Sequence, residues 1–212
     1  MKNKTIMRKI ALLFRGIRRI WRNLFYYITL CRVKWVLFLN QVKYGKRLHC
    51  NGIPYICVSP FEGSLVLGDD LTLNNGIRFN PIGFPQPCTL YVDAHATLVI
   101  GDRVGISQAS IICHHNIRIG NDVKIGGGVK IYDTDFHSLN PKDRLDRNLD
   151  ISNKKKEGVI IGNNVLIGAG AFILKGVTIG DNSIIGAGSV VTKSIPSNQI
   201  WGGNPAELIR KI

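Results

Sequence analysis

The sequence predicts an all-β fold, a parallel β-helix in which the chain winds in flat-faced coils. The first observation behind this prediction is a period of six, because aliphatic residues recur at Ile161, Ile167, Ile173, Ile179, Ile185 and Val191. The second is that glycine follows four of these aliphatics, with Asn, Asp, Ala and Ser at many of the positions between them. Helices and strands have periods of about 3.6 and 2, so neither explains this pattern. Stacked six-residue faces that turn at small residues do explain it.

The same period recurs upstream of this run. It appears at Ile119, Ile125 and Ile131, at Ile100, Ile106 and Ile112, and at Leu67, Leu73 and Phe79. The step from Ile112 to Ile119 is seven, so one extra residue lies near His114 and His115. An extra residue in a regular strand bulges out, and we expect this one to point side chains outward.

Length and composition limit the class of protein. A chain of 212 residues is expected to form one domain with a sizeable core. Five cysteines, an odd number without a CxxC pair, predict free thiols in a reducing compartment, so we expect a cytoplasmic protein. The apolar run from Leu24 to Cys31 is short and lacks a small-residue cleavage site. No apolar run reaches about 18 residues, so neither a signal peptide nor a transmembrane helix is expected.

Residues 1–48 are predicted to form a basic amphipathic helical segment. The formal charge of the chain is +14, and the first acidic residue is Glu62, so the excess of Lys and Arg belongs to this segment. Apolar residues recur at spacings of three and four from Ile6 to Ile28. The opposite face carries Arg8, Arg15, Arg18, Arg19 and Arg22. A second short helix is expected between Trp35 and Tyr44.

The composition of this helix favours an anionic membrane surface as its partner. Basic amphipathic helices with Trp and Phe on the apolar face bind such surfaces, so residues 1–30 are predicted to make peripheral contact with the inner face of the membrane. The alternative is that the helix packs on its own β-helix or on a neighbouring subunit. Nucleic acid is not expected as a partner, because nothing downstream resembles an element that reads bases.

Residues 49–212 are predicted to form the β-helix domain, with the coil beginning near residue 52. Tyr55–Val58 and Ser64–Leu67 are expected to be its first strands. Phe84–Pro87, which contains two prolines, is expected to be a loop that leaves the coil and returns.

The six-residue period disappears between Ile131 and Ile161, where a polar stretch, residues 133–158, takes its place. Long excursions from a regular scaffold commonly carry function, so this stretch is predicted to be the active-site loop. His137 is the candidate catalytic residue, because a neutral imidazole can accept a proton from a hydroxyl. Asp133 and Asp135 lie close enough in sequence to orient its other nitrogen.

The hexads from Val159 to Pro196 and the tail from Gly202 to Ala206 resemble the bacterial transferase hexapeptide family. The similarity is greatest to its maltose, galactoside and surface-polysaccharide O-acetyltransferases and covers roughly residues 63–212. The resemblance implies a left-handed β-helix, although parallel crossovers are otherwise normally right-handed. It also implies a short C-terminal helix after the tail and a homotrimer with active sites between neighbouring coils.

The resemblance further implies an acetyl-CoA-dependent O-acetyltransferase with His137 as general base and no metal. The acceptor would be a sugar hydroxyl in cell-surface polysaccharide or lipid-linked glycan biosynthesis. The positions that would contact acetyl-CoA are Ala169, Ala187, Thr192, Lys193 and Arg210. The small residues among them would admit the pantetheine arm, and the cations would contact the CoA phosphates. His114 matches a position where relatives have a polar group near the acceptor, and Ser107, one coil below, is expected to face the same cleft. Glu207 and Leu166 depart from the family pattern, which often has a cation and a Trp there.

Three other functions remain open at this point. A β-helix can serve as a non-catalytic scaffold. Antibiotic-modifying acetyltransferases share the fold, although a soluble drug requires no membrane helix. A γ-type carbonic anhydrase needs three histidines around one metal, for which the candidates are His114, His115 and His137. Adjacent residues on a strand face opposite sides, so His114 and His115 cannot readily share a metal.

Overall fold

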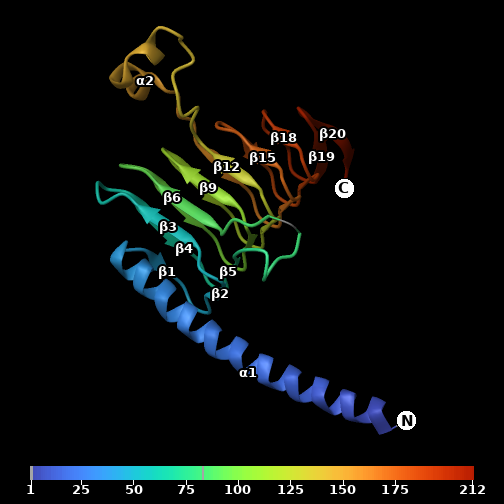
Figure 1. Cartoon of the computed structure of the whole chain (residues 1–212). Coiled ribbons are helices and arrows are strands. Elements are labelled where there is room, and N and C mark those ends of the chain that lie inside the picture. The colour runs from blue at the N-terminus through green and yellow to red at the C-terminus, as the bar shows by residue number, and fades with distance from the viewer. Residues whose placement is uncertain (1, 83) are drawn as a thin grey trace.

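The computed structural model describes residues 2–82 and 84–212, apart from the side chains of residues 2–6, 22 and 23. The faces predicted for the Ile6 and Arg22 side chains therefore lie outside the described residues. The chain winds into stacked coils with three flat faces, and one long helix crosses the first of them (Figure 1). This architecture confirms the predicted left-handed parallel β-helix.

Successive coils contribute strands to three sheets, which are parallel throughout except for β20. Sheet A contains β1 (Lys43–Tyr44), β4 (Ser64–Leu67), β7 (Thr97–Ile100), β10 (Asn116–Ile119), β13 (Val159–Ile161) and β16 (Thr178–Ile179). Sheet B contains β2 (His49–Asn51), β5 (Thr72–Asn74), β8 (Gly105–Ser107), β11 (Lys124–Ile125), β14 (Leu166–Ile167), β17 (Ile184–Ile185), β19 (Gln199–Gly203) and β20 (Ala206–Lys211). Sheet C contains β3 (Tyr55–Val58), β6 (Thr89–Val92), β9 (Ser110–Cys113), β12 (Lys130–Tyr132), β15 (Phe172–Ile173) and β18 (Val190–Val191). We name the turns by the sheets they join, as the A–B, B–C and C–A corners.

The core is the predicted stack of inward-pointing aliphatics. All six residues of the run from Ile161 to Val191 are at most 2% exposed. Full burial of such a side chain contributes about 1.5–3 kcal/mol, so the stack stabilises every coil against its neighbours. Phe79 does not join it, because the chain leaves the coil after β5, and that upstream run ends at Leu73.

Polar side chains form a second stack at the A–B corner. In each step a side-chain oxygen on one coil accepts a backbone N–H from the coil before it, at N···O distances of 2.5–2.9 Å. The accepting residues, in coil order, are Asp69, Asp102, Asn121, Asn163 and Asp181. These oxygens satisfy amides that a tight corner would otherwise leave without a partner. We call this stack the corner ladder.

The N-terminal segment is one uninterrupted helix, α1 (Lys2–Leu39). The prediction of a second helix between Trp35 and Tyr44 was wrong, because the first helix continues to Leu39 and the chain then turns at Gln41, whose φ is 53°. The first coil begins directly afterwards with β1, earlier than the position near residue 52 that was expected.

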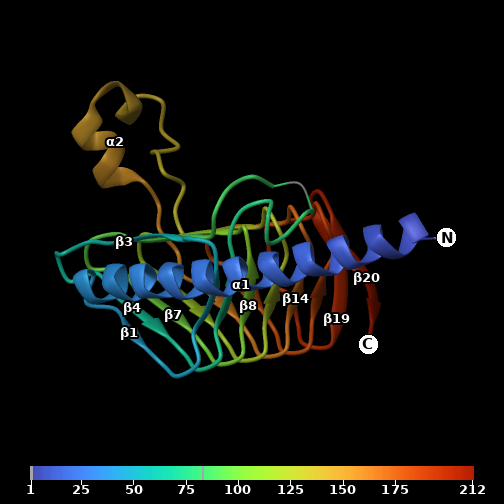
Figure 2. The same ribbon diagram turned by 60° about the horizontal axis from the view of Figure 1, so that its bottom comes forward.

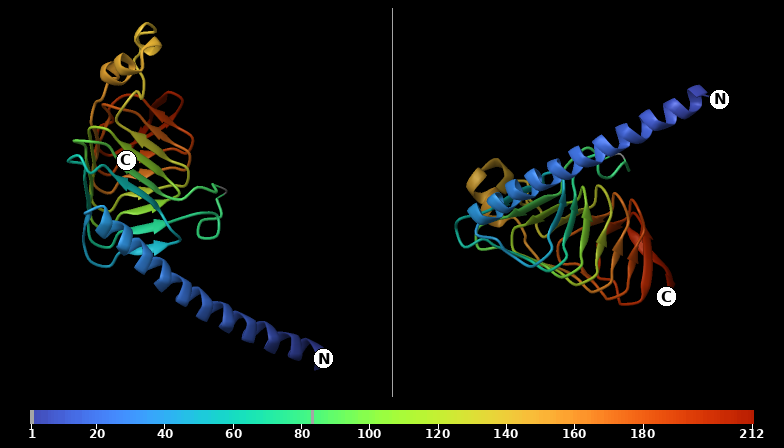
Figure 3. Two further views of the ribbon diagram at one scale, coloured as in Figure 1. Left: turned by 60° about the vertical axis from the view of Figure 1, so that its left-hand side comes forward. Right: turned by 90° about the horizontal axis from the view of Figure 1, so that it is seen from below.

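Only the last third of α1 packs on the β-helix. Thr29, Val33 and Leu37 are at most 2% exposed, whereas the large apolar residues from Met7 to Tyr27 that the structure describes are each at least 44% exposed, apart from the half-buried Tyr26. The helix accordingly leaves the coil at a shallow angle and its N-terminus projects beyond it (Figures 2 and 3). Over the residues described, no helix combines the length and the apolar character needed to cross a bilayer.

The C-terminus corrects the expectation of a short helix. Residues after the Gly202–Ala206 turn form β20, which pairs antiparallel with β19. The last parallel strand of a solenoid leaves a row of free backbone groups, and a hairpin strand pairs with that edge where a helix would not.

Two segments leave the coil at different corners. Residues 75–88 depart at the B–C corner and contain the predicted loop Phe84–Pro87, while residues 133–158 depart at the C–A corner. The second segment, which we call the excursion, contains a 3-10 helix, η1 (Asp143–Leu145), and α2 (Arg147–Asn153). It stands clear of the sheets, as Figure 1 shows in gold.

Candidate active site

The C–A corner gathers chemically active side chains from successive coils. Strand register aligns Val92 with Cys113, so Asp93 and His114 follow at equivalent positions one coil apart. Ile173 aligns with Val191 in the same way, which places Lys175 and Lys193 on neighbouring coils. Neighbouring strands lie about 4.8 Å apart, so this corner carries a continuous line of polar residues with the excursion in its middle.

The excursion is joined to the coil by a short antiparallel stem. Thr134 bridges Lys156, the N–H of Glu157 donates to Asp133 O at 3.0 Å, and the N–H of Asp135 donates to Lys155 O at 3.0 Å. Because both ends of the segment are paired in this way, residues 136–154 are held out from the corner as one unit.

Asp133 anchors the turn between β9 and β10, where the seven-residue step was expected to produce a bulge. Its carboxylate is fully buried and accepts the backbone N–H groups of His114, His115 and Asn116 at 2.7–2.8 Å. The expectation that Asp133 orients His137 is therefore not met, since both of its oxygens are committed to the backbone of the preceding coil.

Asp135 is also engaged elsewhere. Its Oδ1 lies 3.0 Å from Lys175 Nζ, in an ion pair whose side chains are 19% and 22% exposed. This contact attaches the excursion to the next coil. Asp135 Oδ2 is buried and has no hydrogen-bond partner among the described residues. The expected contact between the Asp135 carboxylate and the His137 ring does not form, and the two residues are joined only through the backbone, where the His137 N–H donates to Asp135 O at 2.7 Å.

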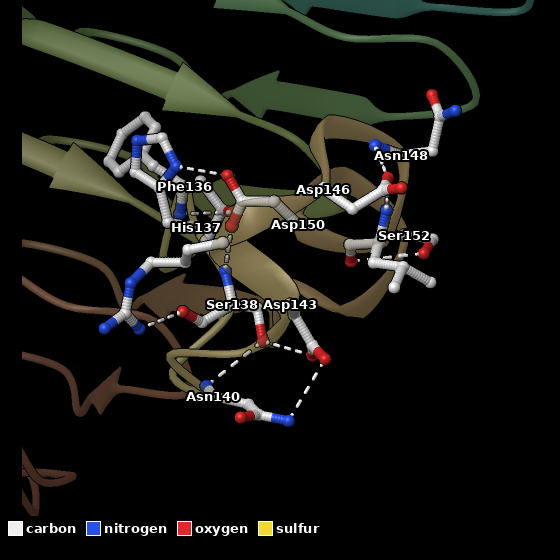
Figure 4. A network of polar contacts seen from close by, with 12 residues as sticks. Phe136, His137, Ser138, Asn140, Asp143, Asp146, Asn148, Asp150 and Ser152 are labelled. Atoms are coloured by element: carbon white, nitrogen blue, oxygen red, sulfur yellow. Dashed lines mark hydrogen bonds and ion pairs between the residues drawn. The ribbon is translucent and has the colours of Figure 1, made fainter.

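His137 instead pairs with Asp150, a residue of α2. The ring Nδ1 lies 2.7 Å from Asp150 Oδ2, and the other carboxylate oxygen accepts the N–H of Ser138 at 2.7 Å (Figure 4). The hydrogen bond from His137 and then that from the Ser138 N–H hold the pKa of Asp150 below its ordinary value, so the carboxylate is ionised near neutral pH. With Nδ1 bonded, Nε2 is left as the proton acceptor of a neutral ring, and the side chain is 69% exposed.

Asp143 connects the rest of the excursion in a network. It accepts hydrogen bonds from Ser138 Oγ at 2.7 Å, from Asn140 Nδ2 at 3.0 Å and from Asn153 Nδ2 at 3.0 Å (Figure 4). Asp146 caps α2 by accepting the N–H groups of the first turn. The segment that carries His137 and Asp150 is thereby ordered by its own side chains.

His114 lies beneath the excursion and is only 12% exposed at its side chain. Its Nδ1 is 2.9 Å from Asp93 Oδ2 and 3.2 Å from Lys154 Nζ, and its ring contacts those of Tyr91 and Phe136. Burial, followed by the charge of Lys154, lowers the pKa of His114 and outweighs the opposing effect of Asp93. A neutral imidazole therefore joins the excursion to the two coils below it.

The proposed acceptor residue Ser107 lies away from His114. It ends β8 in sheet B and accepts a hydrogen bond from Asn74 Nδ2 at 3.2 Å. All of β9 separates it from the C–A corner, so the structure does not bring Ser107 and His114 to one place within a single chain.

Two of the predicted acetyl-CoA positions, Ala169 and Ala187, stack at the B–C corner. A Cβ at Gly126 would meet Ala169 N at 2.7 Å, and one at Gly168 would meet Ala187 N at 2.5 Å, so this corner is built from backbones in close contact. Small residues here leave main-chain groups accessible along the corner, which suits an extended amide-bearing arm.

The cationic positions lie at the opposite edge of sheet C and in β20. Thr192 and Lys193 follow β18 at the C–A corner, and Lys193 Nζ lies 5.4 Å from the centroid of the Trp201 ring. Arg210 lies in β20, opposite Ile200. The predicted acetyl-CoA positions therefore border β18 on both sides, and two of them are cations that a phosphate could contact.

Metal-ligating residue types and cysteines are two further groups of chemically active side chains. Over residues 2–82 and 84–212, no three His, Cys, Asp or Glu side chains come together as a potential metal site. The five cysteines are free thiols, and burial raises the pKa of Cys50 to about 12 and that of Cys88 to about 11. The buried thiols are thus neutral core residues.

Sequence reasoning missed Asp150 as the partner of His137. The two residues are separated by 13 positions in a segment without a repeat, so no periodicity relates them. The available signal was the cap Asp146, which predicts a helix start and hence an acidic residue in its first turn.

Comparison with known proteins relates the chain to a family of transferases. Residues 158–193 match the family described as "Bacterial transferase hexapeptide (six repeats)". The chain is 28% identical over 167 residues to the "Putative lipopolysaccharide biosynthesis O-acetyl transferase WbbJ" of Escherichia coli K12, covering 77% of this chain and 80% of that one.

Solved structures show the same fold. A maltose O-acetyltransferase from Clostridium difficile 630 is 27% identical, with a TM-score of 0.52 over 80% of this chain and 69% of that one. AntD, an N-acyltransferase from Bacillus cereus, is 19% identical and superposes with a TM-score of 0.64 over 84% of this chain and 87% of its own. The likeness to AntD concerns the fold alone.

Proposed function

We propose that the chain is a member of the bacterial transferase hexapeptide family, whose model residues 158–193 match, and that it is an acetyl-CoA-dependent O-acetyltransferase acting on a sugar hydroxyl. The observation that carries the proposal is the His137–Asp150 pair, which leaves one imidazole nitrogen open at the edge of the excursion. The names of the relatives support the reaction class, since two of them are O-acetyltransferases.

His137 acts as the general base in this proposal. Asp150 holds Nδ1 protonated and fixes the ring, so Nε2 accepts the proton of the acceptor hydroxyl. Bound acetyl-CoA supplies the thioester carbonyl carbon, to which the acceptor oxygen bonds as the carbon–sulfur bond breaks. The proton on Nε2 then passes to the departing sulfur, which restores neutral His137 for the next turnover.

The residues present fit an acetyl-CoA donor along β18. Ala169 and Ala187 keep the B–C corner open to an extended arm, while Lys193 and Arg210 provide cations for phosphates. Thr192 lies between these groups at the C–A corner and supplies a hydroxyl. Because His137 stands out on the excursion, we propose that a homotrimer brings it against the β18 region of a neighbouring subunit, with Ser107 near that shared cleft.

His114 contributes to the same site as a positioning residue rather than through direct contact with the acceptor. Its ring joins Asp93, Lys154 and Phe136, so it fixes the base of the excursion relative to the coil. Loss of this contact would move His137 without changing the chemistry of the base.

The acceptor belongs to a cell-surface polysaccharide or a lipid-linked glycan in this proposal. α1 supports this assignment, because its exposed apolar residues and arginines suit a protein that rests on the inner face of an anionic membrane. A cytoplasmic enzyme held there by residues 1–30 would meet glycan intermediates before they are exported.

The test is incubation of the full-length protein with radiolabelled acetyl-CoA and cell-envelope glycan fractions. We expect an alkali-labile O-acetyl ester on a sugar and release of one free thiol per ester formed. The control is the His137→Ala variant, which should form little ester. Absence of ester from every glycan fraction, with thiol release no faster than in buffer, would favour the non-catalytic scaffold. Transfer to an aminoglycoside or another drug in place of glycans would favour the antibiotic-type enzyme.

A further inference from the structure

A cavity of about 800 Å³ lies where α1 separates from the first coil. The helix packs on the coil through Thr29, Val33 and Leu37 and diverges from it toward its N-terminus (Figure 3). The residues that line the cavity come from α1, from β2 with Gly52, and from Arg78 and Phe79. Four arginines line this cavity: Arg15, Arg18 and Arg19 from α1, and Arg78 from residues 75–88. We call it the arginine cleft.

The arginine cleft concentrates positive charge without an internal counter-ion. None of the residues that line it is acidic, and within the described part of the chain none of the four guanidiniums forms an ion pair. Other arginines of the protein do pair, as Arg47 does with Asp70 and Arg103 with Asp122. Convergence of four like charges from two segments is unfavourable unless an anion lies between them.

The walls of the cleft hold Arg78 in place. Its guanidinium carbon lies 5.8 Å from the centroid of the Phe25 ring and 5.9 Å from that of Phe79. The aromatic rings fix the planar group by cation–π contact and leave its N–H donors for a ligand. Asn51 adds a neutral polar side chain from the first coil.

These features fit a phosphate better than a carboxylate or a neutral sugar. Guanidinium groups bind phosphate oxygens through paired, charge-assisted hydrogen bonds, and several of them can share one phosphate or diphosphate. The cleft lies on the first coil at its B–C side, whereas His137 stands on the fourth-coil excursion at the C–A corner. The two sites are therefore distinct.

We propose that the arginine cleft binds a phosphate or diphosphate group, either on a lipid at the surface that α1 contacts or on a soluble phosphate ester. This site does not depend on the acetyl transfer proposed above. It gives α1 a second role, because the helix supplies three of the four arginines and the Phe25 ring that contacts the fourth, Arg78.

The test compares two double variants of the full-length protein with equal charge. The cleft variant carries Arg19→Gln and Arg78→Gln. The control carries Arg8→Gln on α1 and Arg118→Gln on β10, two exposed arginines that do not line the cleft. Titration calorimetry with inorganic pyrophosphate should show at least about a tenfold loss of affinity in the cleft variant and less than about a twofold change in the control.

A vesicle arm separates the two sources of phosphate. Wild-type protein should sediment more strongly with vesicles containing phosphatidic acid, a phosphate monoester, than with phosphatidylserine vesicles matched in surface charge. If only this preference is lost in the cleft variant, the ligand is a lipid headgroup. If pyrophosphate binding is lost and vesicle preference is not, the ligand is a soluble ester.

Equal behaviour of the cleft and control variants in both arms would overturn the proposal, because diffuse charge alone would then explain any anion binding. Circular dichroism first checks that both variants fold. If the cleft double variant does not, single Arg78→Gln and Arg118→Gln variants make the same comparison, since Arg78 lies outside α1.

Discussion

The excursion and the free part of α1 both project from the β-helix, yet they differ in whether their polar side chains find partners within the same segment. In the excursion, Asp143 and Asp150 each accept two or more hydrogen bonds from neighbours in the same segment. Along α1, apolar residues such as Trp21 (65% exposed) have no partner, and the arginines that line the cleft form no ion pair within the described part of the chain. A segment that satisfies its own polar groups can hold a reacting group in position. A segment that does not leaves its side chains available to a partner.

The most sensitive test of the excursion is removal of its open imidazole. General-base catalysis typically contributes about 10²–10⁴-fold, so His137→Ala should reduce the rate of acetyl transfer by that range. His137→Asn should behave similarly, because an amide nitrogen cannot accept the proton. Initial rates with radiolabelled acetyl-CoA measure the effect, and His115→Ala, at an exposed position of the turn after β9, is the control. Near-normal turnover of His137→Ala would remove this residue from the mechanism.

Among the residues of the excursion, Asp133 in the stem should cause the largest loss of stability when it is replaced. Asp133→Ala leaves three backbone N–H groups without their acceptor and should lower the free energy of unfolding by about 2–4 kcal/mol. The matched control is Asp146→Ala, an exposed helix cap, whose loss should cost only about 1 kcal/mol. Urea denaturation followed by circular dichroism compares them. Equal losses would mean that burial of Asp133 adds nothing to its hydrogen bonds.

Weakening the apolar face of α1 should affect membrane binding and leave the excursion intact. Burial of a large apolar side chain contributes about 1.5–3 kcal/mol, so Trp21→Ala with Leu24→Ala should weaken vesicle binding by roughly 10²-fold. Sedimentation with anionic vesicles gives the partition coefficient. Phe61→Ala, a 70% exposed apolar residue on the coil, serves as control. Unchanged binding together with loss of the oligomer would indicate that α1 packs against another subunit instead.

Replacing Asp150 tests whether the excursion acts by positioning its base, because in the proposed mechanism Asp150 orients His137 without touching the acceptor. Asp150→Ala should lower kcat by about tenfold to a hundredfold and leave the KM for acetyl-CoA nearly unchanged. Asp150→Glu, which keeps the charge, should recover part of the rate. A purely structural role would instead lower the amount of folded enzyme with no change in the kcat of the folded fraction.

The smallest expected effect concerns His114 and pH. Because its pKa is lowered in the folded protein, the unfolded chain binds a proton below about pH 6.5 that the folded protein does not. The free energy of unfolding should therefore fall as the pH decreases through this region, and His114→Gln should make that dependence shallower. Urea denaturation between pH 5 and about 7.5 measures it, with His115→Gln as control. An unchanged pH dependence in His114→Gln would show that other groups cause it.

The sequence was informative wherever the chain repeats. The buried stack from Ile161 to Val191, the strands β3 and β4 and the place of the excursion all follow from the six-residue period and its interruption. An outward bulge was expected after Ile112, whereas the structure has a turn at His114 and His115 between β9 and β10, held by the Asp133 carboxylate. That carboxylate was assigned to His137 because proximity along the chain carries no information about which face a side chain takes.

The parts that could not be predicted are contacts between non-repeating segments. The Asp150 contact depends on the path of residues 138–149, and the arginine cleft depends on the angle at which α1 leaves the coil. The C-terminal hairpin was missed for a related reason. Its formation is decided by the free edge of β19, a feature of the assembled sheet and not of residues 206–212 themselves.

The corner ladder makes each coil an exchangeable module with a built-in direction. The side-chain oxygen of Asn163 accepts the backbone N–H of Asn121 in the coil below. The backbone N–H of Asn163 donates in turn to the side chain of Asp181, 18 residues later. A duplicated 18-residue unit inserted after Gly162 would therefore carry one acceptor for the coil beneath and one donor for the coil above, and would lengthen the solenoid without leaving an unpaired amide. Adding whole coils on the C-terminal side of the ladder keeps every backbone amide of the ladder paired. Removing half a coil would break two of these hydrogen bonds at once.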